Sequence, residues 1–235
     1  MVNNWSRINQ NCLLCDERCG THQRFCTACE AELPWLGKHC RVCALPMPAE
    51  GLVCGSCLKR PPGFDRVEAP WRFAFPVDSL IHRFKHQSNW PIGRILGEQL
   101  ALHLQHAFSE GLARPALLLP VPLSRQRLRL RGFNQARMLA DWLGKDLGIR
   151  RESELLLRSR DTPAQQQLDA AARRRNLRQA FALAPGHDLP AHVALIDDVL
   201  TTGATAEALA RLLKAAGSAR VDLYCLARTP RPGDN

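Results

Sequence analysis

The feature that most constrains this chain is a cysteine pattern that occurs twice near its N-terminus. Nine of its ten cysteines lie between Cys12 and Cys57, and eight of these are in the segments CLLC, CTAC, CRVC and CGSC. Each cysteine of a C-x2-C-x10-C-x2-C unit recurs 28 residues later, so the unit is duplicated. Few large apolar residues accompany these turns, and we expect a bound metal to supply most of the folding free energy of this region. The repeated cysteines are Cys12, Cys15, Cys26, Cys29, Cys40, Cys43, Cys54 and Cys57.

Four thiolates from two C-x-x-C turns match the tetrahedral coordination of Zn²⁺ and leave no open position for catalysis. Disulfides are disfavoured because nothing directs the chain out of the cytosol, and a redox C-x-x-C usually occurs once beside a βαβ unit. An iron–sulfur cluster would accept the same thiolates, but paired spacing is more typical of zinc ribbons. We expect one or two structural zinc ions. Either each unit closes its own site or the pairs cross over, and Cys19 is a free thiol or an alternative ligand.

After Cys57, strand and helix patterns alternate beyond a Pro- and Gly-rich linker, LKRPPGFDR. VEAPWRFAF predicts an antiparallel strand, with Pro70 favouring an edge position, and ALLLPVPL predicts a strand buried on both faces. ELLLRS, HVALIDD and ARVDLYCLAR predict further strands, the last with Cys225 as a buried apolar residue. Helices are predicted over 76–86, 91–111, 132–148 and 205–217. This alternation predicts an α/β domain with a mainly parallel sheet over residues 61–235, preceded by a small Cys-rich double zinc ribbon over residues 1–60.

Composition limits where the chain acts and what it contacts. Its 235 residues are 46% hydrophobic, enough for a sizeable core. No apolar run reaches the roughly 18 residues of a membrane span, and no signal peptide is recognisable, so we expect a cytoplasmic protein without membrane insertion. The net charge is +10, and residues 121–180 carry 14 Lys and Arg against 6 Asp and Glu. That segment is either a solvated helical surface or an anion-binding face for phosphates or nucleic acid.

The stretch VALIDDVLTTGAT, Val193–Thr205, points to a specific ligand chemistry. Ligands of open parallel sheets bind beyond the carboxyl ends of the strands, where Asp197 and Asp198 are expected to face solvent and the ligand. A hydroxyl-rich turn opening a helix offers N–H donors to a phosphate, and the aspartates can accept from sugar hydroxyls or hold the water shell of Mg²⁺. The predicted site is therefore one for a sugar phosphate. Its phosphate loop comprises Thr201, Thr202, Gly203, Ala204 and Thr205.

ALIDDVLTTGAT resembles the phosphoribosyl-pyrophosphate motif of type I phosphoribosyltransferases. Together with the paired cysteines, IHRFKHQ, LLLPVPLSRQRLRLRGFNQA and RDTPAQQQLDAAARRRNLRQAF, it resembles the ComF competence-protein family over residues 12–228. The resemblance implies that Asp197 and Asp198 contact ribose and Mg²⁺. It also implies a pyrophosphate loop after the buried strand and a mobile hood over the site, in which Gln165, Arg174, Asn176 and Arg178 are candidates. Further substrate-binding candidates are Lys85, Arg125, Arg127 and Arg131.

Three hypotheses about function follow from the residues and the resemblance. The protein binds phosphoribosyl pyrophosphate, a nucleotide or a DNA end, and acts in DNA uptake during natural transformation or in the use of imported DNA. Alternatively, it is an active phosphoribosyltransferase of nucleotide metabolism whose acceptor the sequence does not identify. Thirdly, its zinc ribbon docks a helicase-like partner. Single-stranded DNA is a candidate ligand of the basic segment in the first of these.

Overall fold

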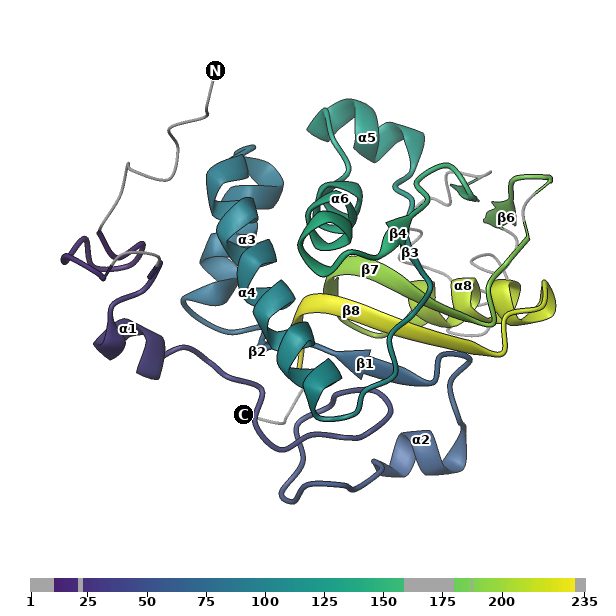
Figure 1. Cartoon of the computed structure of the whole chain (residues 1–235), viewed down its shortest axis with the longest axis horizontal. Coiled ribbons are helices and arrows are strands. Elements are labelled where there is room, and N and C mark those ends of the chain that lie inside the picture. The colour runs from purple at the N-terminus through teal and green to yellow at the C-terminus, as the bar shows by residue number, and fades with distance from the viewer. Residues whose placement is uncertain (1–10, 21–22, 159–179, 187, 231–235) are drawn as a thin grey trace, which may run out of the picture.

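A computed structural model describes residues 11–20, 23–158, 180–186 and 188–230 of the chain. Its centre is a parallel sheet with strand order β1-β8-β7-β3-β4, and β2 pairs with β8 beyond β1 (Figure 1). A separate antiparallel pair joins β5 to β6. The strands are β1 Arg66–Glu68, β2 Trp71–Arg72, β3 Leu117–Pro120, β4 Arg150–Arg151, β5 Leu156–Arg158, β6 Phe181–Leu183, β7 His192–Leu200 and β8 Arg220–Arg228.

The predicted parallel α/β class is confirmed, with one error in strand direction. The segment expected to be an antiparallel strand forms β1 and β2, which both run parallel to β8. Pro70 separates them because it has no N–H to give to the ladder, although its carbonyl accepts a hydrogen bond from Leu36 N at 2.9 Å. The edge position predicted from Pro70 is correct, since β1 ends the strand order.

Two apolar faces of the sheet are covered by different elements. Ala194 and Ile196 of β7 pack on one face, and Val193 and Leu195 pack on the other, as the two-residue period of a strand requires. Helices α3, α4 and α6 cover the first face, and α8 covers the second (Figure 1). Cys225 is fully buried on the second face, as predicted. The helices are α1 Thr27–Ala31, α2 Gly55–Lys59, α3 Val77–His86, α4 Trp90–Ser109, α5 Arg125–Arg131, α6 Gln135–Leu147 and α8 Ala204–Ala215.

Local signals explain where the predicted helices begin and end. Asn89 and Asn134 cap α4 and α6 by accepting hydrogen bonds from backbone N–H groups of the first turn. Gly148 ends α6 with a φ of 65°, a left-handed conformation that favours glycine. In the part of the chain that is described, no helix combines the length and apolar character needed to cross a membrane.

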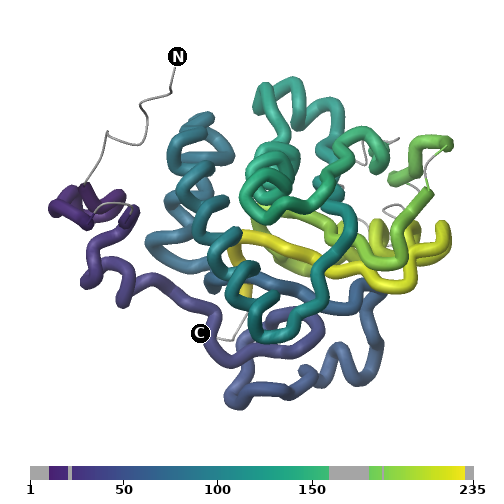
Figure 2. Tube along the Cα trace, in the orientation of Figure 1, coloured from purple at the N-terminus to yellow at the C-terminus, as the bar shows by residue number. Residues whose placement is uncertain are grey.

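The two cysteine units pack against opposite faces of the sheet domain. Cys12, Phe25 and Leu33 of the first unit and its flank join the core beneath α3 and α4, whereas Leu36 and Ala44 join the core beneath α8. The chain from the first unit to the second therefore passes around the edge of the domain (Figure 2). The Cys-rich segment is thus fixed to the sheet domain on both sides.

Candidate functional site

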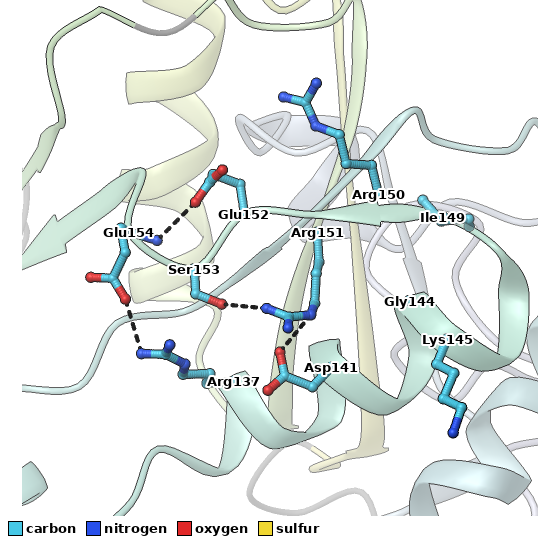
Figure 3. A pocket seen from close by; sticks show the side chains of 10 residues that line it. All are labelled: Arg137, Asp141, Gly144, Lys145, Ile149, Arg150, Arg151, Glu152, Ser153 and Glu154. Carbon is cyan, nitrogen blue, oxygen red and sulfur yellow. Dashed lines mark hydrogen bonds and ion pairs between the residues drawn. The ribbon is translucent and has the colours of Figure 1, made fainter.

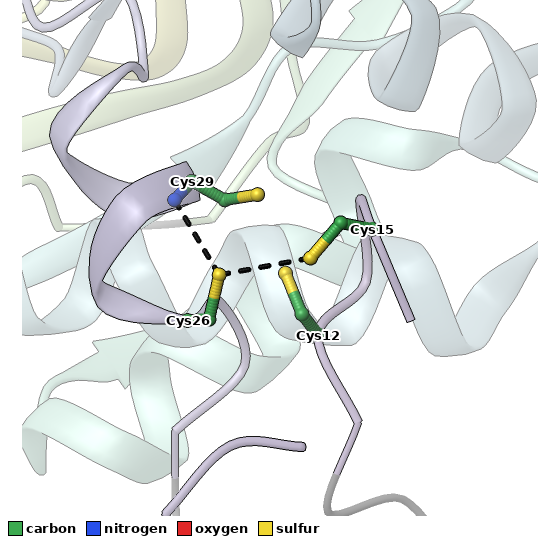
Figure 4. A group of neighbouring side chains, drawn as sticks. All are labelled: Cys12, Cys15, Cys26 and Cys29. Atoms are coloured by element: carbon green, nitrogen blue, oxygen red, sulfur yellow. Dashed lines mark hydrogen bonds between the residues drawn. The ribbon is translucent and has the colours of Figure 1, made fainter. Parts of the chain in front are cut away.

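Each cysteine unit closes its own four-sulfur cluster, so the pairs do not cross over. The four Sγ atoms of each cluster lie within 4.8 Å of one another (Figure 4). Tetrahedral zinc with Zn–S bonds of about 2.3 Å requires sulfurs about 3.8 Å apart; Cys15 and Cys26 are 3.6 Å apart, and Cys43 and Cys54 3.7 Å. Cys19 lies outside the clusters. The donor sets are consistent with two structural zinc ions.

The two clusters differ in their environment although their spacing is identical. Cys15 of the first cluster is exposed, whereas three of the four cysteines of the second cluster are buried. Burial disfavours the thiolate of Cys12, but backbone N–H donors outweigh it and lower the pKa of this thiol to about 6. The same balance lowers the pKa of Cys40 to about 7. Each cluster therefore has one thiol prepared for metal coordination by its backbone.

The adjacent aspartates lie on β7, which continues beyond them to Leu200. Asp198 is buried, contrary to the expectation that both carboxylates face solvent, and its Oδ2 atom lies 2.6 Å from Nζ of Lys85 on α3. Asp197 Oδ1 accepts a hydrogen bond from Asp198 N at 2.8 Å. Burial, followed by the charge of Asp198, raises the pKa of Asp197 well above its usual range. Asp198 forms the ion pair with Lys85, and no ion pair joins Asp197 to a cation among the described residues.

Between β7 and α8, the predicted phosphate loop is shorter than expected. Gly203 has a φ of 76° and immediately precedes α8, so Ala204 and Thr205 are the first helical residues. Thr202 Oγ1 accepts a hydrogen bond from Ala204 N at 3.4 Å. Among the described residues, the N–H groups of Thr202 and Gly203 have no acceptor. These free donors at the N-terminus of a 12-residue helix form a site suited to a phosphate.

The arginine cluster after β3 forms helix α5, where the resemblance implied a pyrophosphate loop. In a helix, residues four apart share a face, so Arg127 and Arg131 lie on one face and Arg125 and Arg129 on another. Burial, with the charge of Arg127, lowers the pKa of Arg131, and the charges of both aspartates act on it in the opposite direction. Arg131 thus lies within electrostatic range of the carboxylates. Arg125 instead lines a shallow depression with Arg129, and no described contact links it to the aspartates.

Two residues near the site were not identified from the sequence. His86 follows Lys85 on α3 and is exposed; partial desolvation lowers its pKa, nearby cations, Arg131 foremost, add to this effect, and the charge of Asp198 opposes it. Arg228, at the end of β8, donates hydrogen bonds to the carbonyls of Leu200 and Thr201. His86 lies in the IHRFKHQ stretch but was not singled out there, and Arg228 lies in none of the quoted motifs; the pairing of strands and the packing of helices bring them to the site. The hood candidates Gln165, Arg174, Asn176 and Arg178 lie outside the described residues.

A larger concavity at the β4 edge contains none of the predicted site residues (Figure 3). Two of its four cations are paired: Arg151 Nε lies 2.9 Å from Asp141 Oδ1, and Arg137 Nη1 lies 2.9 Å from Glu154 Oε1. Arg150 and Lys145 also line this concavity.

Comparison with known proteins places the chain in a family. A model described as "Double zinc ribbon domain" matches residues 8–58. "DNA utilization protein YhgH" of Escherichia coli O6:H1 is 37% identical over 222 residues, covering 93% of this chain and 90% of that protein. "Competence protein F" of Haemophilus influenzae is 34% identical over 207 residues, covering 87% and 84%.

Among solved structures, the adenine phosphoribosyltransferase of Leishmania tarentolae aligns with 16% identity and a TM-score of 0.38. The alignment covers 56% of this chain and 70% of that one, a likeness too slight to support an argument about function. The assignment depends instead on the two sequence relatives, which each span more than four fifths of both chains, and on the duplicated cysteine clusters. The chain belongs to the ComF/YhgH competence protein family.

Proposed function

We propose that this protein binds phosphoribosyl pyrophosphate, or a nucleotide or DNA end with the same ribose-phosphate chemistry, between β7 and α8. The observation that carries the proposal is the pair Asp197 and Asp198 near the end of β7, followed by a loop whose Thr202 and Gly203 N–H groups have no acceptor among the described residues. The loop suits the 5′-phosphate, and the carboxylates suit the ribose hydroxyls. Two relatives are named for DNA utilization and competence, which supports a role in the use or uptake of DNA.

Lys85 has a defined task in this proposal. Its ammonium group neutralises Asp198, whose Oδ2 atom lies 2.6 Å from Lys85 Nζ. Asp197 and Asp198 are the residues that would hold Mg²⁺, since oxygen ligands suit this ion. Mg²⁺ would supply charge neutralisation of the pyrophosphate. Lys85 can then turn from Asp198 to the phosphate, so binding exchanges one ion pair for another.

Transfer of the phosphoribosyl group is a second candidate function, favoured by the cations beside the carboxylates. In this reaction the bond from ribose C1 to pyrophosphate breaks as an amine attacks the opposite face of C1. Catalysis requires orientation of both partners and neutralisation of the departing charge, for which Lys85, Arg127 and Arg131 are suitably placed. Pyrophosphate release from phosphoribosyl pyrophosphate with Mg²⁺ and each nucleobase in turn measures this activity.

Calorimetric titration with phosphoribosyl pyrophosphate and Mg²⁺ tests the binding proposal. We expect saturable binding to the wild type and at least a tenfold loss in Asp197→Ala/Asp198→Ala, because both sugar and metal contacts are removed. Lys214→Ala is the matched control, since Lys214 pairs with Asp65 at 2.8 Å beyond the site. Absence of binding to the zinc-loaded wild type, or equal affinity in the double variant, would overturn the proposal.

The exposed arginines of α5 extend this site into a surface for single-stranded DNA. Arg125, Arg127 and Arg129 are all exposed on this helix. Three phosphate contacts give a slope of about −2 in a plot of log affinity against log salt for a single strand. We expect a triple alanine variant to flatten that slope in an oligonucleotide titration, and an unchanged slope would exclude the surface. A helicase-like partner remains a prediction of the family resemblance.

A further inference from the structure

Arg228, the last residue of β8, is a buried cation whose described partners are carbonyl oxygens. It is 8% exposed. Its Nε atom donates to the carbonyl of Cys43 at 2.9 Å. Its Nη1 atom donates to the carbonyls of Leu200 at 3.0 Å and Thr201 at 2.7 Å, and also to that of Thr229. No carboxylate forms an ion pair with it in the described parts of the chain. Its charge is therefore balanced by the dipoles of these carbonyls.

These acceptors belong to segments far apart in the sequence. Cys43 belongs to the second four-cysteine cluster, whereas Leu200 and Thr201 connect β7 to the phosphate loop. One guanidinium group therefore joins the second metal site to the loop. Lysine cannot replace it, because three fixed donor directions are needed and an ammonium group on a flexible stem does not preserve them.

The hydrogen bond to Thr201 also fixes the direction of a donor in the loop. In a planar trans peptide, the carbonyl of Thr201 and the N–H of Thr202 point in opposite directions. Holding this carbonyl toward Arg228 therefore turns the Thr202 N–H away from the protein interior around Arg228. That N–H group has no acceptor among the described residues. It is therefore free to donate to the phosphate of a ligand.

In the described parts of the chain, no equivalent connection reaches the loop from the first cysteine cluster. That cluster packs on the opposite face of the sheet, and its neighbour Arg24 pairs with Glu98 of α4 at 3.4 Å. We propose that Arg228 is a positioning residue that couples the second metal site, but not the first, to the geometry of the phosphate loop. This inference rests on the proposed ribose-phosphate function, because it assigns the loop a phosphate ligand.

The duplication provides a matched pair of variants to test the coupling. Cys15→Ser and Cys43→Ser alter the second cysteine of the first and second cluster, and we expect each to lower zinc content by about one ion per chain. Only Cys43→Ser is expected to weaken binding of phosphoribosyl pyrophosphate, by about tenfold. It should also increase amide hydrogen exchange at residues 201–203 in the absence of ligand. Equal effects of the two variants on the loop would overturn the proposal.

Arg228→Met tests the connecting residue itself. We expect it to keep both zinc ions, to raise exchange at residues 201–203 and to weaken binding about tenfold, with no further loss when combined with Cys43→Ser. Arg228→Lys retains the charge and should show the same loop exchange, because the fork of donors is lost. Unchanged exchange in both Arg228 variants refutes the coupling. If the wild type binds no phosphoribosyl pyrophosphate, the proposed function fails, while the exchange data still decide whether the metal site and the loop are coupled.

Discussion

Replacing Lys85 by methionine tests how the protein tolerates a buried aspartate at this site. At the observed 2.6 Å between Lys85 Nζ and Asp198 Oδ2, opposite unit charges attract by about 6 kcal/mol at an effective dielectric constant of about 20. Desolvation offsets much of this attraction, since it costs several kcal/mol per ion. The Lys85 side chain is 27% exposed, so water screens the pair further. We expect a net coupling energy of about 2 kcal/mol.

A double-mutant cycle of Lys85→Met and Asp198→Asn measures this coupling. Urea unfolding of the zinc-loaded protein at neutral pH and low salt gives the free energy of unfolding for each variant. Lys85→Met should lower it by about 2–3 kcal/mol because an unpaired carboxylate stays buried. Adding Asp198→Asn should restore most of that loss, since the neutral amide removes the unpaired charge.

The pair Lys214 and Asp65 provides the control for this cycle. Its atoms are 2.8 Å apart, nearly the same separation, but its side chains are 34% and 38% exposed. An exposed pair contributes less than about 1 kcal/mol, because solvent and salt screen it. A coupling energy for Lys85 and Asp198 no larger than that of this control pair would refute the argument from burial.

Two further predictions concern Asp197, whose ionised form is disfavoured by its surroundings, and Gly93, whose neighbours leave no room for a Cβ atom. Burial and Asp198 raise the pKa of Asp197 above its unfolded value, so the folded state loses stability as pH rises through the interval between the two pKa values. Asp197→Asn should therefore raise the calorimetric melting temperature of the ligand-free protein by about 2–4 °C at neutral pH, with little effect below about pH 4. A Cβ atom on Gly93 would lie 2.3 Å from Phe84 Cδ2, so Gly93→Ala should lower the free energy of unfolding by about 1–3 kcal/mol in urea. Gly97→Ala, whose nearest contact would be 3.2 Å, should cost less.

The sequence predicted features that depend on local spacing. Two C-x-x-C turns separated by ten residues limit how far apart four sulfurs can lie, and both clusters form as expected. Asn134 and Gly148 mark the ends of α6 because capping and left-handed φ angles are properties of single residues. The Asp-Asp-x-x-Thr-Thr-Gly order likewise places the carboxylates near the end of the strand that leads to the N-terminus of α8.

Features that depend on long-range packing could not be predicted from local spacing in the sequence. Arg125, Arg127 and Arg131 looked equivalent as alternating cations, but the helical period of α5 places only the last two on the face near the aspartates. Asp198 is buried beside Lys85 of α3, a residue 113 positions earlier in the chain. The role of Arg228 depends on three carbonyls that no local pattern connects.

Two adjacent aspartates on a central strand repel each other, and the structure reduces this repulsion in two ways. Asp198 is neutralised by Lys85, and Asp197 has a raised pKa because burial and its neighbour disfavour a second negative charge. Both solutions are reversible, since a divalent cation would stabilise the ionised form of Asp197 and replace Lys85 at Asp198. Binding of Mg²⁺ should then release protons from Asp197 and free the Lys85 ammonium group for a phosphate. If both carboxylates were always ionised and unpaired, Asp198 would have no lysine 2.6 Å away and the pKa of Asp197 would not be raised. This arrangement therefore favours a cation that binds together with its anionic ligand.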